Sequence, residues 1–302
     1  MSIIERARRA AVVSTRRYLA RHRSATPFRK AISICESLVD GYHNHDYDLK
    51  TNGEFWVLST LARFPLSCFI DVGANIGDWT SAVKSTFPSA TVHSFEIHPQ
   101  TFATLSETMG RLSGVNVVNS GLSDRSEDLQ LYCFGNQSEL TSAIAYPHDE
   151  HLRRQTVAGH AVSGDSYVSQ KSIDHIDFLK IDVEGMEDKV LRGFEETIRR
   201  DAIDVIQFEY GRVNILTHFL LRDFYEYLES RGYSVGKIYP RGVDFRPYSV
   251  LDEDFRGPNY LACRKNKPHY ILRLGLTGTA PTPSTRGWAT FVRARRGARI
   301  GI

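Results

Sequence analysis

The sequence predicts an α/β fold in which a mostly parallel sheet is covered by helices on both faces. Short, fully apolar runs alternate with amphipathic runs of helical period between residues 46 and 265. The first apolar run leads directly into a glycine-rich turn and a helix, as βαβ units do. Strands that are apolar on both faces are typical of parallel sheets buried on both sides. With 302 residues, 41% of them hydrophobic and 24% charged, the chain can bury a large core.

The elements follow in this order along the chain. Apolar or alternating runs predict strands over 68–72, 91–97, 115–120, 128–134, 176–181 and 205–208. Runs of helical period predict helices over 79–87, 102–109, 187–199 and 220–228. The last two strands, 235–238 and 260–263, have no predicted helix between them, which favours a terminal antiparallel hairpin.

Charge divides the chain into three parts. Residues 1–30 carry a net charge of +8 and residues 266–302 carry +7, which leaves −12 for residues 31–265. We therefore expect a basic helical extension over 1–45, one domain over 46–265, and a basic, flexible tail over 266–302 that is rich in Gly, Thr and Pro. An acidic body with basic ends argues against nucleic acid as the partner, but the ends could contact an anionic membrane surface.

The cysteines and the lengths of the apolar runs indicate the cellular compartment in which we expect the protein. The four cysteines, Cys35, Cys68, Cys133 and Cys263, are far apart and show no zinc-binding spacing. No apolar run is long enough for a membrane-spanning helix or a signal-peptide core. We expect reduced thiols and a cytoplasmic protein, peripheral at the inner membrane surface if the basic ends bind lipid.

The segment 69–80 is the most informative motif. It reads as a strand, a glycine turn and the start of a helix, and its predicted cofactor-binding residues are Asp71, Gly73, Ala74, Asn75 and Gly77. Gly73 permits a sharp turn with close ligand approach, and Gly77 permits close packing of the helix on the strand. Ligands of open α/β sheets bind at this end of the strands.

The acids around this turn distinguish two cofactors. A nicotinamide-binding loop requires G-x-G-x-x-G, and Asn75 stands where its second glycine would be. Asp71 precedes the glycines and would repel a pyrophosphate, but it would favour a cationic ammonium or sulfonium. Glu96 ends the second strand, where an acid can accept hydrogen bonds from both ribose hydroxyls. This combination fits S-adenosylmethionine better than a dinucleotide.

A second group of acids follows two later strands. Asp182 and Glu184 alternate with apolar residues at the end of the strand 176–181, and Glu209 ends the strand 205–208. Carboxylates at this edge can act as a general base or bind a divalent cation such as Mg²⁺, and the sequence does not divide these roles. Glu187 and Asp188 are interpreted as acids that favour the next helix's N-terminus. The histidines near residues 45 and 150 lack a full ligand set and are interpreted as loop residues.

Five blocks together resemble the FkbM family of methyltransferases. They are Asp71–Gly77, Phe95-Glu96, Gly121–Asp124, Leu179–Gly185 with its following helix, and Gln207–Gly211, in the family's order within residues 46–265. The resemblance implies the Rossmann-like class I methyltransferase fold, a seven-stranded sheet whose last strand is antiparallel. It also implies O-methylation of hydroxyls on polyketides, sugars and similar metabolites. Glu96-Ile-His-Pro99 departs slightly from the family's Glu-Pro, but the acid is kept.

The leading hypothesis is an S-adenosylmethionine-dependent methyltransferase that acts on a hydroxyl of a small metabolite, sugar or glycan. A nicotinamide-dependent oxidoreductase and a non-catalytic interaction module with the same fold are the alternatives. The stretch 135–164 is interpreted as a long insertion near the cofactor mouth that shapes the acceptor site. The sequence leaves the acceptor, the metal dependence and the oligomeric state open.

Overall fold

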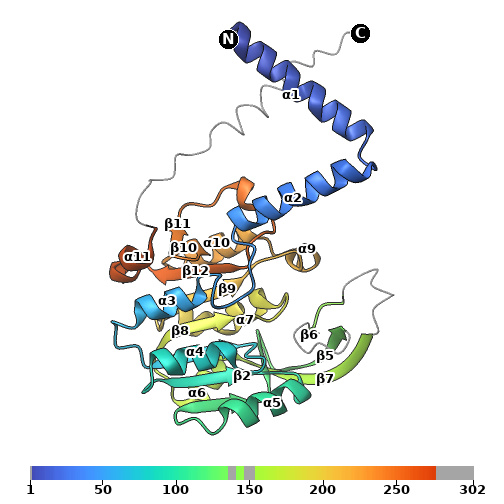
Figure 1. The fold of residues 1–302 in the computed structure, drawn as a ribbon. Coiled ribbons are helices and arrows are strands. Elements are labelled where there is room, and N and C mark those ends of the chain that lie inside the picture. Colours follow the sequence, from blue (N-terminus) through green and yellow to red (C-terminus); the bar gives the residue numbers. More distant parts are fainter. Residues whose placement is uncertain (1, 135–140, 146–153, 277–302) are drawn as a thin grey trace, which may run out of the picture.

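The structure is a computed structural model that describes residues 2–134, 141–145 and 154–276 (Figure 1). Eight strands form the main sheet in the order β11-β10-β12-β9-β8-β1-β2-β3. In chain order they are β1 (Cys68–Val72), β2 (Thr91–Phe95), β3 (Val115–Val118), β8 (Ile176–Ile181), β9 (Ile203–Glu209), β10 (Tyr233–Tyr239), β11 (Gly242–Phe245) and β12 (Asn259–Arg264).

The strand directions confirm the predicted α/β class. β3, β2, β1, β8 and β9 pair in parallel, and β12 is antiparallel to β9. β10 pairs antiparallel with β12, as the predicted terminal hairpin requires. The short strand β11, which the sequence did not predict, lies at the edge beside β10 and raises the described strands from the expected seven to eight.

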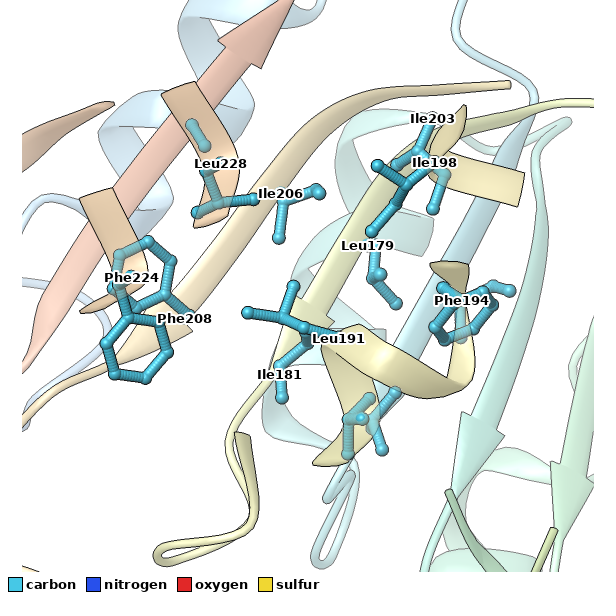
Figure 2. Close-up of a cluster of buried hydrophobic side chains, with 14 of the residues drawn as sticks. Leu179, Ile181, Leu191, Phe194, Ile198, Ile203, Ile206, Phe208, Phe224 and Leu228 are labelled. Atoms are coloured by element: carbon cyan, nitrogen blue, oxygen red, sulfur yellow. The ribbon is translucent and has the colours of Figure 1, made fainter. Parts of the chain in front are cut away.

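Helices cover both faces of the sheet, and as a result β8 and β9 are buried almost throughout. One face packs against α3 (Glu54–Leu61), α4 (Asp78–Thr86) and α11 (Pro268–Leu274). The other packs against α6 (Gly164–Lys171), α7 (Glu187–Gly193), α8 (Glu195–Arg199) and α10 (Leu221–Glu229). Figure 2 shows this second core, with Leu179 and Ile206 of the strands lying near Leu191 and Phe194. The helix expected over 187–199 is thus two short helices.

A second, four-stranded sheet was not predicted. It has the order β4-β7-β5-β6 and comprises β4 (Gly121–Ser123), β5 (Glu127–Phe134), β6 (Thr141–Ser142) and β7 (Arg154–Ser163). The stretch 135–164, expected as a loop, therefore contains a ten-residue strand that pairs along the whole of β5. The rest of that expectation, at 135–140 and 146–153, lies outside the described residues.

The N-terminal segment is helical. α1 (Ile3–Arg21) and α2 (Thr26–Tyr42) contain no buried residue and extend away from the sheets (Figure 1). The remaining helices are α5 (Pro99–Met109), which lies against β3, the short α9 (Asn214–Thr217) and a 3₁₀ turn over Val250–Asp252. All four cysteines are free thiols. Within the described residues no helix is long and apolar enough to cross a membrane.

The C-terminal boundary differs from the expectation. The tail predicted to be flexible from residue 266 begins with the helix α11, whose Tyr270 and Leu274 are buried against α3 and β12. The helix has only seven residues, which is too short for its apolar side chains to show a clear helical period in the sequence. Residues 277–302 of the predicted tail lie outside the described part of the chain.

Candidate active site

The glycine turn connects β1 to α4 at the carboxyl edge of the sheet. Gly73 has φ +84°, and a Cβ at this position would lie 1.8 Å from the carbonyl oxygen of Asp182. Gly77 has φ +100°, and a Cβ there would lie 2.5 Å from the Met109 side chain on α5. Both positions therefore require glycine, for two reasons: left-handed backbone and lack of space. The turn packs directly against the segment that follows β8.

Glu96 closes the other side of this turn. Its carboxylate accepts hydrogen bonds from the backbone amides of Asn75 at 3.0 Å and His98 at 2.7 Å. Burial raises the pKa of Glu96 to about 7, although these amides act in the opposite direction. The Asn75 side-chain oxygen is buried and has no hydrogen-bond partner among the described residues. An acceptor carboxylate and an unpaired amide oxygen are thus held at the ends of β1 and β2.

Asp71 lies behind the turn rather than in the cavity. It is fully buried, accepts a hydrogen bond from Thr80 at 2.8 Å and lies 3.8 Å from the Lys180 ammonium. The sequence placed Asp71 beside a cationic ligand, and this geometry corrects that expectation: its carboxylate faces the protein's own lysine. Period-two alternation of the strand explains the difference, because residues at alternate positions of β1 face opposite sides.

Asp182, Glu184 and Glu209 form one acid cluster. One carboxylate oxygen from each lies within 4.8 Å of the others. Glu209 donates a hydrogen bond to Asp182, and Lys180 donates to Asp182 at 2.9 Å. The structure therefore brings together the three acids that the sequence placed at the ends of two neighbouring strands, and it adds a buried cation to them.

Burial and the neighbouring charges give the three acids of this cluster different pKa values. Burial opposes ionisation of Asp182, but Lys180 and the hydrogen bond from Glu209 outweigh it and lower the pKa of Asp182. Burial, and then the negative charge of Asp182, raise the pKa of Glu184 to about 8. The same two causes raise the pKa of Glu209 well above its usual value. The raised pKa values of Glu184 and Glu209 thus favour their protonated forms beside an ionised Asp182.

The loop that carries Asp182 and Glu184 is fixed from two sides. Glu187, 1% exposed, accepts hydrogen bonds from the amides of Val183 at 3.2 Å and Gly185 at 3.1 Å. Ser142 of β6 donates to the Glu184 carbonyl at 2.6 Å. Glu187 thus orders the loop, a role beyond the helix-terminal one predicted from the sequence. Asp188 pairs with Arg192 one turn later at 3.0 Å, as a residue of the first helical turn.

A single cavity joins the turn to the acid cluster. It has a volume of about 190 Å³, opens partly to solvent, and is lined by Gly73, Asn75, Glu96 and the three cluster acids, with Leu122 and Leu131 on its apolar wall. Apolar walls with a few converging polar groups are the character of a small-molecule site. A neighbouring cavity between residues 47–55 and α4 shares Gly73, Asn75 and Asp182 with it, and Ala74 lines this second cavity.

Sequence reasoning missed two contributors. Tyr47 lines both cavities, and burial followed by the nearby Glu209 raises its pKa to about 12. Lys180 is 6% exposed within β8, a strand whose residues are all buried. A lysine in a fully buried strand is a signal in itself, because such a charge needs a buried partner. Tyr47 gave no comparable signal.

A buried polar network supports the floor of the site. Glu54 of α3 accepts hydrogen bonds from Asn52 at 2.7 Å, Gln207 at 2.6 Å and Asn259 at 3.1 Å. Burial raises the pKa of Glu54, and Lys180 acts against that shift. Its members lie far apart in the sequence, so no motif could have identified them.

The histidines near residue 45 take structural roles. His43 pairs with Asp254 at 3.1 Å, and His45 lies 3.1 Å from the Tyr47 hydroxyl. Neither belongs to a group of metal-ligating side chains in the described part of the chain. The histidines near residue 150 lie outside the described residues.

Comparison with known proteins gives a consistent set of relatives. Residues 71–235 match the sequence profile of the methyltransferase FkbM domain. Methyltransferase sdnD of Sordaria araneosa is 30% identical over 165 residues, which cover 45% of this chain and 64% of that protein. The 2-O-methyltransferase NoeI of Sinorhizobium fredii is 24% identical over 61% of this chain and 79% of its own length. Hexuronic acid methyltransferase AglP of Haloferax volcanii is 28% identical over 47% and 55%. The chain thus spans less than two thirds of sdnD and of AglP.

Proposed function

The chain belongs to the FkbM family of methyltransferases, and we propose that it transfers the methyl group of S-adenosylmethionine to a hydroxyl oxygen of a sugar, glycan or other small molecule. The observation that carries the proposal is the single cavity in which the glycine turn, Glu96 and the acid cluster meet. An oxygen acceptor is supported by the name of NoeI, and a sugar acid by that of AglP.

The residues around the turn fit the donor that this family membership implies. When bound, S-adenosylmethionine supplies a methyl group activated by a sulfonium. We assign the ribose hydroxyls to the Glu96 carboxylate, whose acceptor oxygens line the cavity at the end of β2. Asn75 offers a buried oxygen without a partner among the described residues, and Gly73 and Gly77 hold the left-handed backbone of the turn that borders the cavity. Ala74 borders the site, and Asp71 acts from behind by holding Lys180.

The acid cluster supplies proton removal. The acceptor oxygen forms a bond to the methyl carbon, the carbon–sulfur bond breaks, and the hydroxyl proton must leave during transfer. Asp182 is the ionised member of the cluster and is assigned as the group that takes this proton. Glu209 stabilises the Asp182 charge by donating a hydrogen bond to it, and Glu184 completes the cluster.

A divalent cation gives the same cluster a second way to remove the proton. Three carboxylate oxygens within 4.8 Å of one another form an oxygen-only donor set of the kind that Mg²⁺ accepts. Bound there, Mg²⁺ would ionise Glu184 and Glu209 and lower the pKa of a coordinated hydroxyl. Turnover measured with added Mg²⁺ and after chelation separates this route from direct base action, because a carboxylate base works without the ion.

Two experiments test the function. Calorimetric titration with S-adenosylmethionine, with NAD⁺ as the matched control, should give binding of the first alone. Turnover of S-adenosylmethionine labelled in its methyl group, against a panel of sugars, uronic acids and hydroxylated metabolites, should transfer label to oxygen. Binding of NAD⁺ alone would favour the oxidoreductase alternative. Binding of S-adenosylmethionine without transfer to any acceptor would favour the non-catalytic alternative.

The same proposal includes the location of the enzyme. Free thiols at all four cysteines support a cytoplasmic protein. The +8 charge of residues 1–30 supports peripheral contact with an anionic membrane surface. A glycan acceptor carried on a lipid would then be presented at the surface where the enzyme binds.

A further inference from the structure

α2 has a broad apolar face that the described structure leaves largely exposed. At about 100° per residue its apolar side chains fall within an arc of about 160°. They are Phe28, Ala31, Ile32, Ile34, Cys35, Leu38, Val39 and Tyr42. Ile34 is 63%, Leu38 70% and Tyr42 79% exposed. An uninterrupted face of this width normally packs against a core or another apolar surface.

The C-terminal end of α2 is fixed to the body by its polar side. Asp40 pairs with Arg256 at 3.3 Å, and His43, the residue after the helix, pairs with Asp254 at 3.1 Å. Asn44 is buried and donates to the carbonyl oxygen of Ile238 at 3.0 Å. Because the polar side faces the protein, the apolar side is directed away from it. The helices project from the body in Figure 1 accordingly.

α1 supplies positive charge next to this face. Its six arginines are opposed by a single acid, Glu5, and Arg23, Arg29 and Lys30 follow within the next turns. None of these nine cations forms an ion pair with a described residue. The Tyr18 ring contacts the Phe28 ring edge-on, with centroids 5.8 Å apart, which links the two helices. This contact joins the C-terminal end of α1, which carries Arg16, Arg17 and Arg21, to the start of the apolar face of α2.

We propose that α1 and α2 dock the protein on an anionic phospholipid surface, with α2 lying in the membrane plane and its apolar face inserted at the headgroup boundary. An apolar face joined to clustered arginines is the pattern of interfacial helices. α2 cannot span the bilayer, because its other side carries Arg29, Lys30, Glu36 and Asp40. The proposal does not depend on the methyltransferase assignment.

Charge favours a lipid surface over a second copy of the chain as the occupant. Two copies joined through these helices would bring two sets of nine cations together, and that repulsion opposes the pairing. An anionic surface attracts the helices and repels the body, since residues 31–265 carry −12. The same asymmetry orients the protein with the helices toward the lipid and the body away from it. Only four residues separate Tyr42 at the end of α2 from Tyr47 in the site, which ties the docked helix to the cavity.

Vesicle flotation of the full chain tests this inference. We expect it to float with phosphatidylcholine–phosphatidylglycerol vesicles and not with phosphatidylcholine alone. The double variant Ile34→Ser/Leu38→Ser removes exposed apolar side chains only and should weaken vesicle binding by about tenfold or more. Arg16→Glu/Arg17→Glu should weaken it similarly. The matched control is Leu272→Ser on α11, which also removes an exposed leucine (80%) but should leave binding unchanged.

The outcomes distinguish a lipid surface from a second copy of the chain as the occupant, and they test membrane docking separately from the proposed function. Undiminished vesicle binding by Ile34→Ser/Leu38→Ser would overturn insertion. Insertion would also be overturned if the unaltered chain did not bind anionic vesicles, was dimeric by light scattering, and the Ile34→Ser/Leu38→Ser variant was monomeric. Calorimetry with S-adenosylmethionine on the same preparations reports the proposed function independently, because the variants lie outside its cavity. If the α1 and α2 variants lose vesicle binding but still bind S-adenosylmethionine, this result assigns the two helices to the membrane.

Discussion

Lys180 sits between Asp71 and Asp182, and this position decides which acid of the site is ionised. Its ammonium lies 2.9 Å from Asp182 and 3.8 Å from Asp71, in a strand that is otherwise closed to water. Burial alone would lower the pKa of Lys180, but the surrounding carboxylates raise it. A permanent cation at this point keeps Asp182 charged and leaves the proton on Glu209.

The first residue-scale prediction concerns Asp182. Asp182→Asn keeps the shape and removes the charge, so turnover per folded molecule should fall by about 10²–10⁴-fold if general-base action is lost. Affinity for S-adenosylmethionine should change little. Lys180 keeps Asp71 as a partner, but the variant should also lose some stability, which thermal unfolding measures separately. A variant with full turnover would remove Asp182 from the mechanism and make Glu209 the next residue to test.

The second prediction concerns Glu96, whose pKa is raised to about 7. Its ionised form is the stronger acceptor for ribose hydroxyls, so affinity for S-adenosylmethionine should increase as the pH rises from about 6 to 8. Glu96→Gln cannot ionise, and its single amide oxygen can accept from only one of the Asn75 and His98 amides, which bind different oxygens of the carboxylate. It should bind more weakly by about 1.5–3 kcal/mol and lose the pH dependence, as measured by calorimetry. Equal affinity and an unchanged pH profile in Glu96→Gln would contradict the ribose assignment.

At the scale of elements, local motifs were predictable and long-range pairings were not. The β1–α4 turn is encoded within twelve consecutive residues, and Asp182 and Glu209 each end a strand visible from its apolar run. The pairing of β5 with β7 joins residues that lie 20 to 34 positions apart, and nothing in the intervening polar stretch specifies it. The network around Glu54 combines residues from α3, β9 and β12, so only the folded chain brings it together.

The element-scale prediction concerns the domain boundaries, which we propose to move from 46–265 to 43–276. Cutting at 265 removes α11, whose buried Tyr270 and Leu274 cover α3, and cutting at 46 removes Asn44 and its hydrogen bond to Ile238. Burial of a large apolar side chain is worth about 1.5–3 kcal/mol. A protein of residues 46–265 should therefore unfold at clearly lower denaturant than one of residues 43–276. Equal unfolding midpoints for the two proteins would instead support the sequence-based boundaries of 46 and 265.

At the scale of the whole molecule, the acidic body and its basic helices have separate electrostatic roles. The body brings Glu96, Glu184 and Glu209 to one edge of the sheet, where burial raises their pKa values. The helices concentrate cations away from that edge (Figure 1). The sequence predicted this asymmetry from counts of charge alone. It could not predict that the helix after the cations would expose an apolar face, because burial depends on what the body leaves uncovered.

The buried acids also set the pH dependence of stability. Glu96 and Glu187 have pKa values raised to about 7, and Glu184 to about 8, with burial as the largest cause. Below the unfolded pKa of about 4.5 these groups are protonated in both states. Above it the folded state binds more protons, so stability falls as the pH rises toward the folded pKa values. His93, with its pKa lowered by burial to about 4, acts in the opposite direction only below about pH 6.5.

We therefore expect the melting temperature of the ligand-free protein to fall between about pH 6.5 and pH 8.5, the range in which these buried acids lose their protons in the folded state. Glu187 is the sharpest test, because it is 1% exposed and its second carboxylate oxygen has no hydrogen-bond partner among the described residues. Glu187→Gln keeps an oxygen for the amides of Val183 and Gly185 and removes the titration. Its melting temperature should depend less steeply on pH in this range, with the difference from the unaltered protein largest at the alkaline end. Parallel melting curves at every pH would mean that Glu187 titrates in the folded protein as it does in the unfolded chain.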